Sequence, residues 1–322
     1  MSIRFSIKPM AYAVALIATG GLLGACGGGS SDGPRIEVSS ATAYLLTSDK
    51  RIIGVDLDDT EFARSVKDIL TNTVDNTDAN YSVNMLDIGE QVLDIDYRNS
   101  EGLLYALTRS GSEERVVIID PTTGFIARRG TITPSLSDVS FTIDFNPVND
   151  TLRAIGSDNT NYSITITSNT AATAEGAPAP TATSTQDTNI DCTSCNTSFL
   201  GSAYTDEGTA TTGNRTSRLF GMDTSNTYAL DDATTGAVST VRSLGISAAT
   251  KVNGFDIDPI TQRGIAIITA NGAAMVYTID STFNGTGNAA NDGPTLPTLP
   301  NAETYTGLSL VTPANPTTST AG

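Results

Sequence analysis

The chain has 322 residues, of which 35 are acidic and 18 are basic, so its formal net charge at pH 7 is −17. A domain this acidic repels nucleic acid and anionic lipid headgroups, which excludes nucleic-acid binding and a polybasic membrane-binding patch. The chain contains no histidine, which excludes a histidine general base, a Ser-His-Asp triad and a histidine-ligated zinc or haem site.

Residues 1–25 are predicted to be a lipoprotein signal peptide. Arg4 and Lys8 precede an apolar run at residues 11–24, which is short for a membrane span. The run ends in the sequence LGAC, which resembles the lipobox of bacterial lipoproteins and contains Cys26. We therefore expect cleavage before Cys26 and lipidation of this residue, for example with palmitate. The alternative is an ordinary signal peptide with a chance cysteine.

Residues 26–40 are predicted to be the lipidated cysteine and a flexible tether. The sequence GGGSSDGP at residues 27–34 is rich in glycine and serine, which form solvated chains that do not pack. The protein is therefore expected in the cell envelope, held to the membrane by its N-terminal lipid. Gly27, in place of an aspartate, follows Cys26, and by resemblance to Gram-negative sorting signals this favours the outer membrane if the organism is Gram-negative.

The remaining sequence predicts an all-β domain at residues 41–313 and a disordered tail at residues 314–322. The chain has no tryptophan and is rich in residues that favour short strands and turns over helices. The domain is long enough for one large core. One helix-like spacing, which includes Val66 and Leu70, is interpreted as a connection between strands.

A strand that ends in aspartate recurs along this domain. Its copies end at residues 56, 120, 223 and 280, and a weaker copy ends at residue 167. An alanine lies 13 or 14 residues before each of these positions, at Ala43, Ala106, Ala154, Ala210 and Ala266. A leading strand that contains an aspartate precedes three of the alanines, at Asp96, Asp144 and Asp256. Two hairpins in each repeat make a four-stranded sheet, so five repeats predict a five-bladed β-propeller.

The two ends of the domain are predicted to meet in the first blade. The first repeat has no leading strand, because residues 27–38 are tether, whereas the sequence GLSLV at residues 307–311 matches GFDI at residues 254–257. We therefore expect the C-terminal strand around Leu308 to pair with the segment near Tyr44. Such pairing would remove exposed sheet edges.

The aspartates at the strand ends have two possible interpretations. They could be catalytic acids or metal ligands, but a short carboxylate that enters a turn also accepts a hydrogen bond from the backbone two residues later. We favour the turn interpretation, also for the DPTTG sequence at residues 120–124 and the DATTG sequence at residues 232–236. We expect no metal site and no cofactor.

Several segments of the domain carry a family resemblance. They are IGEQVLDIDYR at 88–98, LYAL at 104–107, DFNPVNDTLR at 144–153, AYT at 203–205, LG at 244–245 and GFDI at 254–257. With these segments the chain, from residue 42 to 313, resembles the secreted bacterial domain of unknown function numbered 4394. The resemblance implies a propeller-like fold but brings no established activity, ligand or catalytic residue. The chain departs from the pattern after Asn159.

A long insertion at residues 171–198 contains the pair Cys192 and Cys195. The spacing is shared by redox proteins, but here an anion, Asp191, lies beside the first thiol instead of a helix N-terminus. One pair also lacks the further ligands of a zinc site. We expect a local disulfide between Cys192 and Cys195, which suits an oxidising compartment. A redox role is the alternative.

Two further groups of charged residues are candidate binding sites. Asp56, Asp58 and Asp59 form an acidic cluster without the spacing or glycine of a calcium-binding EF-hand, so a solvated turn is favoured over a calcium site. Arg98 and Arg153 lie near matching positions of two repeats. They are either paired with nearby carboxylates or bind an anionic ligand near the axis.

These observations favour a non-enzymatic binding or scaffold protein, expected to be a monomer, whose partner is an envelope protein or a glycan. The alternative is an extracytoplasmic hydrolase or lyase that uses a pair of carboxylates, since such an enzyme needs no histidine. A purely structural role in the envelope is the third possibility.

Overall fold

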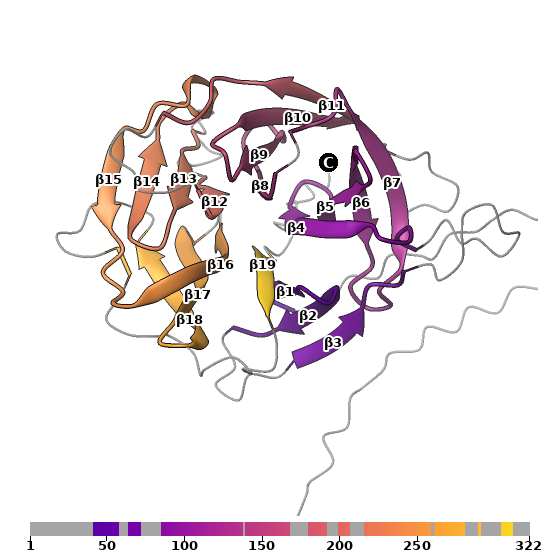
Figure 1. The fold of residues 1–322 in the computed structure, drawn as a ribbon, viewed down its shortest axis with the longest axis horizontal. Coiled ribbons are helices and arrows are strands. Elements are labelled where there is room, and N and C mark those ends of the chain that lie inside the picture. The colour runs from indigo at the N-terminus through magenta and orange to yellow at the C-terminus, as the bar shows by residue number, and fades with distance from the viewer. Residues whose placement is uncertain are drawn as a thin grey trace, which may run out of the picture. The chain divides into compact units, whose positions relative to one another are not determined.

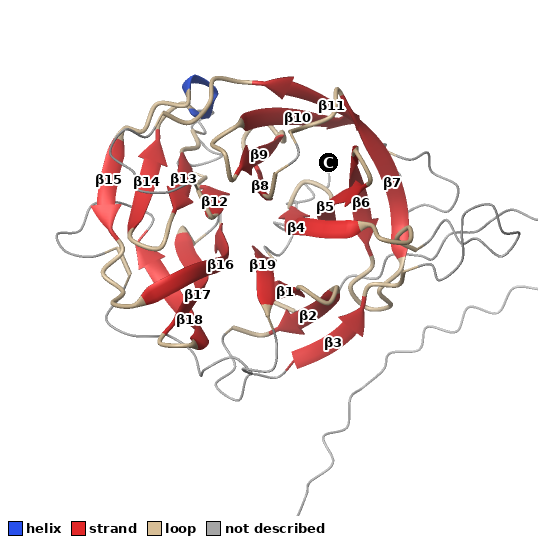
Figure 2. Ribbon diagram, viewed as in Figure 1, coloured by secondary structure: helices blue, strands red, loops and turns tan. Residues whose placement is uncertain are grey.

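The computed structural model divides the chain into two units, Met1–Ser31 and Asp32–Gly322. It describes residues 41–57, 64–71, 85–137, 139–167, 180–191, 199–206, 216–258, 261–280, 289–290 and 304–311, all of which belong to the second unit. These residues form β-strands and one short 3-10 helix, Ala233–Thr235 (Figure 2). None of the described helical structure has the length and apolarity needed to cross a bilayer.

The strands form four sheets. Their orders are β19-β1-β2-β3, β4-β5-β6-β7-β11-β10-β9-β8, β12-β13-β14-β15 and β16-β17-β18. The bounds are β1 Ala43–Thr47, β2 Arg51–Val55, β3 Arg64–Asp68, β4 Gln91–Arg98, β5 Leu103–Ser110, β6 Glu113–Ile119, β7 Ile126–Thr133, β8 Phe141–Phe145, β9 Leu152–Gly156, β10 Asn161–Thr167, β11 Thr181–Gln186, β12 Gly201–Tyr204, β13 Leu219–Met222, β14 Asn226–Leu230, β15 Thr240–Ser243, β16 Ala249–Ile257, β17 Arg263–Ala270, β18 Ala273–Asp280 and β19 Tyr305–Leu310.

The first sheet joins the two ends of the domain. Strand β19 pairs antiparallel with β1, and Leu308 lies opposite Leu45 while Ser309 lies opposite Tyr44. The predicted pairing of the C-terminal strand with the segment near Tyr44 is therefore confirmed. In the strand order of this sheet β19 comes first, so it forms one edge, and β1 is its hydrogen-bonded neighbour (Figure 1).

The eight-stranded sheet consists of two antiparallel groups of four strands, β4 to β7 and β8 to β11. The groups meet through parallel pairing of β7 with β11, in which Ile132 lies opposite Ala182 and Thr133 opposite Thr183. Within each group, consecutive strands pair antiparallel in chain order, as expected for hairpins. The junction is short in comparison with the ladders inside each group.

One edge strand of each group or sheet faces a common axis (Figure 1). These inner strands are β4, β8, β12, β16 and β19. They contact one another in a closed cycle, because β4 contacts β8, β8 contacts β12, β12 contacts β16, β16 contacts β19, and β19 contacts β4. Side chains on the inner strands are thereby brought together from positions more than a hundred residues apart in the sequence.

The core lies between the sheets, and most strands are buried on both faces. Strand β5 illustrates this, because Tyr105 and Leu107 belong to one apolar cluster while Leu104 and Ala106 belong to another. Side chains alternate between the two faces of a strand, so a strand packed on both sides needs apolar residues at every position. This explains the continuous apolar runs in the sequence.

Three details differ from the sequence-based expectations. Residues 64–68, near the helix-like spacing, form strand β3. The strand that ends before Asp223 is β13, which occupies the second place in its sheet instead of the third. Strand β11 lies within the predicted insertion and pairs with β10. Strands β3 and β11 have few apolar residues and so resemble connections in sequence. Strand β13 is a short apolar run followed by a polar residue, which fits several places in an antiparallel sheet.

Candidate functional site

Three aspartates lie together at the axis. Asp96 on β4, Asp144 on β8 and Asp256 on β16 are each 5% exposed, and one carboxylate oxygen of each lies within 4.8 Å of the others. Each occupies the same place near the end of an inner strand, directly between two apolar or aromatic residues. The cyclic arrangement of the inner strands is what makes the three side chains converge.

Hydrogen bonds between neighbouring inner strands hold these side chains. At four of the junctions, an inner-strand side-chain oxygen accepts from the backbone N–H of the next strand. The acceptors and donors are Asp96 Oδ2 and Phe145 N (2.6 Å), Asp144 Oδ1 and Tyr204 N (3.0 Å), Asp256 Oδ2 and Leu310 N (2.6 Å), and Ser309 Oγ and Tyr97 N (2.7 Å). We call this repeated set the axial belt. It gives the buried carboxylates partners and ties the sheets to one another.

The environment raises the pKa of all three carboxyls. Burial is the largest cause for each, because it disfavours the charged form, and it raises the pKa of Asp256 to about 7. For Asp96 and Asp144, the charge of neighbouring carboxylates raises the pKa further, well above the usual range. Asp94, one layer along β4, is also buried, and its pKa is raised to about 8.

One carboxylate oxygen of Asp144 and one of Asp256 lie within 4.8 Å of each other. Two ionised carboxylates offer acceptors only, so a hydrogen bond between them requires that one of them holds a proton. No arginine or lysine of the described chain lines the pocket beside them, so burial favours a proton on this pair over two negative charges.

A small pocket opens beside the three aspartates. Among its lining residues are Tyr97, Asn99, Pro147 and Tyr204. Its free space is about 10 Å³, which is close to what one water molecule needs. The Oδ1 atom of Asn99 is buried and has no hydrogen-bond partner among the described residues. In this conformation the pocket has no room for a sugar or a peptide side chain.

Arg98 is buried in a network that links β4 to the neighbouring strands. Its guanidinium donates to both oxygens of Asp150, from Nε at 3.0 Å and from Nη2 at 2.6 Å, and Nη1 lies 3.1 Å from Glu101. It also lies over the rings of Tyr105 and Phe145. The structure thus provides the carboxylate pairing that was one of the two interpretations of Arg98. Binding of an anionic ligand stays a prediction.

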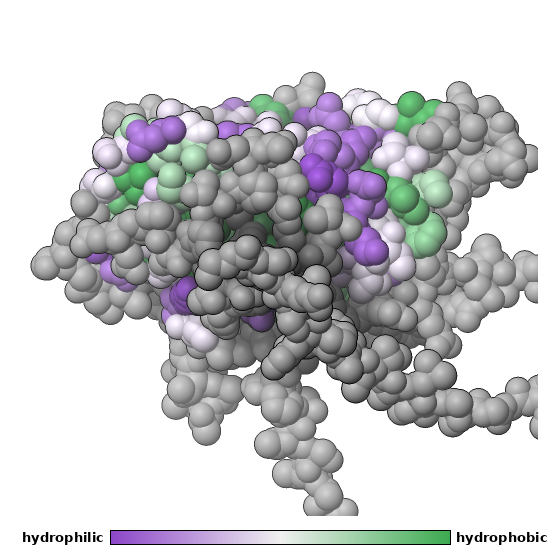
Figure 3. Space-filling model, turned by 90° about the horizontal axis from the view of Figure 1, so that it is seen from below, coloured by the Kyte–Doolittle hydropathy of each residue, from purple (hydrophilic) through white to green (hydrophobic). Residues whose placement is uncertain are grey.

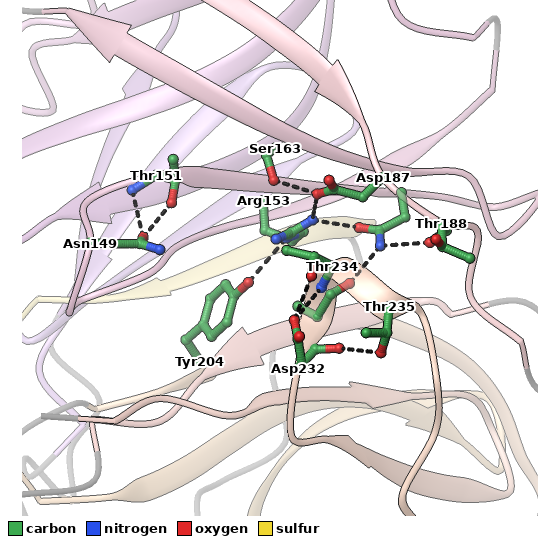
Figure 4. A network of polar contacts seen from close by, with 12 residues as sticks. Asn149, Thr151, Arg153, Ser163, Asp187, Thr188, Tyr204, Asp232, Thr234 and Thr235 are labelled. Atoms are coloured by element: carbon green, nitrogen blue, oxygen red, sulfur yellow. Dashed lines mark hydrogen bonds and ion pairs between the residues drawn. The ribbon is translucent and has the colours of Figure 1, made fainter.

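Arg153 lies in a separate network (Figure 4). Its Nε donates to the hydroxyl of Tyr204 at 3.0 Å, and its Nη1 donates to Asn161 and to Asp187, at 2.8 and 2.5 Å. The amide of Asn161 continues the network to the backbone oxygens of Thr188 and Ala233. Arg153 is therefore also paired internally and joins β9 to β12, and an anion-binding role for it stays a prediction.

The remaining candidate residues lie outside the described part of the chain, except Asp56, whose carboxylate accepts from the hydroxyl of Thr42 at 3.4 Å. Those outside it are Cys26, Cys192, Cys195, Asp58 and Asp59. Lipidation of Cys26 and the disulfide between Cys192 and Cys195 therefore stay predictions.

The turn interpretation of the aspartates is confirmed for some and wrong for others. Asp120 and Asp232 each accept from the backbone N–H two residues later, at 2.8 and 2.9 Å. Asp96, Asp144 and Asp256 instead bind the neighbouring inner strand. The available signal was their context, because an aspartate between apolar residues of a strand is buried, whereas an aspartate before Thr-Thr-Gly or Pro-Thr is in a turn.

Radial antiparallel sheets whose inner strands form a closed cycle define a β-propeller, with the axial belt at its centre. The chain belongs to the family described as "Domain of unknown function (DUF4394)", whose model matches residues 65–308. The resemblance found in the sequence is thereby confirmed. No curated protein matches the chain.

The chain is also similar to solved structures. It is 14% identical to the β-propeller domain of Cps50 (Swd1) from Myceliophteria thermophila, with a TM-score of 0.37, covering 70% of this chain and 63% of that one. It is 11% identical to an engineered GH43 glycoside hydrolase, with a TM-score of 0.46, covering 81% of this chain and 53% of that one. For the Dos1 propeller the identity is 9% and the TM-score is 0.38, covering 76% and 61%. The chain thus spans less than two thirds of each of these proteins.

Proposed function

We propose that this protein is a lipid-anchored, five-bladed β-propeller of the cell envelope that binds a partner there and performs no catalysis. The cycle of inner strands supports the blade count, since β4, β8, β12, β16 and β19 would each begin one blade. The eight-stranded sheet then counts as two blades that touch through the short pairing of β7 with β11. The blade begun by β19 combines both ends of the domain.

The anchor is supported by the sequence. Residues 1–25 would be removed as a signal peptide, Cys26 would carry the lipid, and residues 26–40 would separate the propeller at residues 41–313 from the bilayer. Residues 314–322 would be a free tail. The strong negative charge of the chain would keep the propeller away from anionic headgroups, so the lipid would be its link to the membrane.

The observation that carries the non-catalytic proposal is the use of all three axial carboxylates in the belt. Each accepts a backbone hydrogen bond from the next inner strand. A carboxylate-based hydrolase needs one free carboxyl on each side of a scissile bond, with a substrate between them. The free space of about 10 Å³ at Asp96, Asp144 and Asp256 holds one water molecule and no sugar.

A partner would therefore be bound on the outer surface, and an envelope protein or a glycan suits the compartment. Large hydrophobic residues that are exposed in the described part, Ile88, Val148, Leu200 and Val241, come from different strands and turns. In the face shown in Figure 3, hydrophobic residues lie in separate patches among hydrophilic ones. This surface favours recognition through polar contacts over a large apolar interface.

Replacing Cys26 by serine is expected to release the protein from the membrane. Without the thiol no acyl chain can be attached, so an alkyne analogue of palmitate should label the wild-type protein and not Cys26→Ser. The variant should also leave the membrane fraction on cell breakage. Equal labelling and equal sedimentation of both proteins would refute the anchor.

Crosslinking in intact cells tests binding against catalysis. A photoreactive residue at position 148 or 88, both exposed, should yield the same crosslinked partner from wild-type protein and from Asp96→Asn. For the enzyme alternative, purified protein should release fragments from envelope glycans, and Asp96→Asn should not. Fragment release that requires Asp96 would overturn the binding proposal, whereas a defined partner captured by both proteins would support it.

A further inference from the structure

The axial belt is interrupted at one junction. At the place that Asp96, Asp144, Asp256 and Ser309 occupy on their strands, β12 has Ala203, since Tyr204, the residue after it, donates to Asp144. Alanine has no side-chain oxygen, so it offers no acceptor to Ile257, the corresponding donor of β16. The N–H of Ile257 donates to Asp256, the residue before it, at 2.6 Å. Tyr97 makes the same bond to Asp96, at 2.8 Å, but its N–H also donates to Ser309 on the neighbouring strand.

A second layer of contacts is interrupted at this junction and at two others, because glycine holds the corresponding place on β12, β16 and β19, at Gly201, Gly254 and Gly307. Two residues earlier on the inner strands, Asp94 accepts from Ile143 N at 2.9 Å and Thr142 accepts from Ser202 N at 3.1 Å. On β12 this place is Gly201, and a Cβ there would lie 2.8 Å from Cβ of Phe255. The β12–β16 junction is therefore closely packed and apolar at both levels.

The carboxyls of Asp144 and Asp256 meet across this interruption. They belong to β8 and β16, the two inner strands that flank β12. One oxygen of each carboxyl lies within 4.8 Å of the other, so a proton on either one can serve both. We propose that a proton shared by Asp144 and Asp256 replaces the missing belt contact, so that closure of the propeller at the β12–β16 junction depends on pH.

The groups around the pair give it no compensating charge. Asp96 and Tyr97 face it from β4, Tyr204 from β12, and Asp258 from the end of β16, while Asp94 lies one layer away. The residues that line the pocket include no arginine or lysine. The guanidinium of Arg153 lies beyond the hydroxyl of Tyr204, to which it donates. Loss of the shared proton would therefore place two adjacent negative charges in a buried site.

The direction of the pH effect follows from the raised pKa values. In the unfolded chain these carboxyls ionise near pH 3.9, whereas burial raises the pKa of Asp256 to about 7 in the folded protein. The folded state thus holds protons that the unfolded state has lost, and its stability falls as the pH rises from about 4 to about 7. For each such proton, the equilibrium constant of unfolding increases about tenfold for every unit by which the pH rises within this range.

The experiment compares wild-type protein, Asp256→Asn and Ala203→Ser between pH 5 and 8. An asparagine at 256 donates an N–H to Asp144 at every pH. The factor by which the unfolding constant increases per pH unit should therefore be about ten times smaller in Asp256→Asn than in wild type. Asp232→Asn, in an exposed turn, is the control and should retain the wild-type slope. The slope is compared, and not the absolute stability, because asparagine also loses one acceptor.

Native-state hydrogen exchange locates the effect and remains available if Asp256→Asn does not fold. After correction for intrinsic exchange, amides of β16 next to β12 should open more readily at pH 8 than at pH 5, and those at the β4–β8 junction should not. In Ala203→Ser the new hydroxyl can accept from Ile257, so this increase should shrink at least severalfold. Equal slopes in wild type and Asp256→Asn, or equal opening at both junctions, would overturn the proposal.

Discussion

Replacing Arg98 by alanine is expected to lower the free energy of unfolding by about 3 kcal/mol. The guanidinium is 5% exposed, binds both oxygens of Asp150 and contacts Glu101. It also donates to the backbone oxygen of Ile166 at 3.2 Å. Its removal leaves carboxylates and a carbonyl without their partner and opens space beside two aromatic rings. Most of this loss comes from Glu101, which is 15% exposed, and from the buried carbonyl and rings, because Asp150 is 42% exposed and water can replace its partner.

Chemical denaturation measures this loss, and the chain offers a matched control in Arg51. Arg51 binds Asp49 at 2.9 Å, but the two side chains are 23% and 59% exposed. Solvent screens such a pair, so Arg51→Ala should cost less than about 1 kcal/mol. Arg98→Lys should fall between the two, because lysine retains the charge and cannot bind both oxygens of Asp150. If Arg98→Ala costs no more than Arg51→Ala, the network does not stabilise the junction.

The same variants separate the two interpretations of Arg98. If Arg98 also binds an anionic ligand, that ligand will stabilise the wild-type protein in proportion to the logarithm of its concentration. The stabilisation should disappear in Arg98→Ala. A thermal shift that is equal in both proteins assigns the arginine to the ion pairs alone.

Replacing Gly254 by alanine is expected to lower the free energy of unfolding by about 2 to 3 kcal/mol. A Cβ at this position would lie 2.6 Å from the backbone nitrogen of Leu308 and 2.7 Å from its Cβ. Both atoms belong to β19, which is fixed by its pairing with β1 and by the bond from Leu310 to Asp256. The backbone of one inner strand would have to move away from the other.

The control for this substitution is Gly111→Ala. Gly111 has a φ of +62° and open space around its missing Cβ, so alanine there adds only backbone strain of about 1 kcal/mol. Denaturation at fixed pH compares the two. Gly254→Ala should also increase the hydrogen exchange of β19 more than that of β4 to β7. A loss equal to that of Gly111→Ala would contradict the close approach of β16 and β19.

Much of the fold could be predicted because its signals are local. The turn at Asp120 formed as expected, since its carboxylate binds the backbone of residues that follow it directly, and Gly124 has the positive φ of +78° that the turn requires. The pairing of β19 with β1 was also predictable. It followed from one repeat that lacked its leading strand and from a matching strand at the other end of the domain.

The place of a strand within its sheet was less predictable. The segment before Asp223 resembles a third strand in sequence but is the second strand, β13. Strand β11 comes from an alanine- and threonine-rich segment that resembles a loop. The alternation of apolar and polar residues, together with the turn residues, predicts which segments form paired strands. It does not predict the position of a strand within the sheet, because the same pattern is compatible with several positions.

The sequence by itself determined the class of the fold, the exclusion of histidine chemistry and the predicted lipid anchor at Cys26, because each depends on composition or on residues adjacent in the chain. Only the tertiary structure decided that Asp96, Asp144 and Asp256 meet at the axis and that Ala203 interrupts their belt. Their convergence depends on the angles at which five inner strands pack around the axis. Those angles arise from contacts between residues far apart in the chain, and such contacts cannot be predicted from a local sequence pattern.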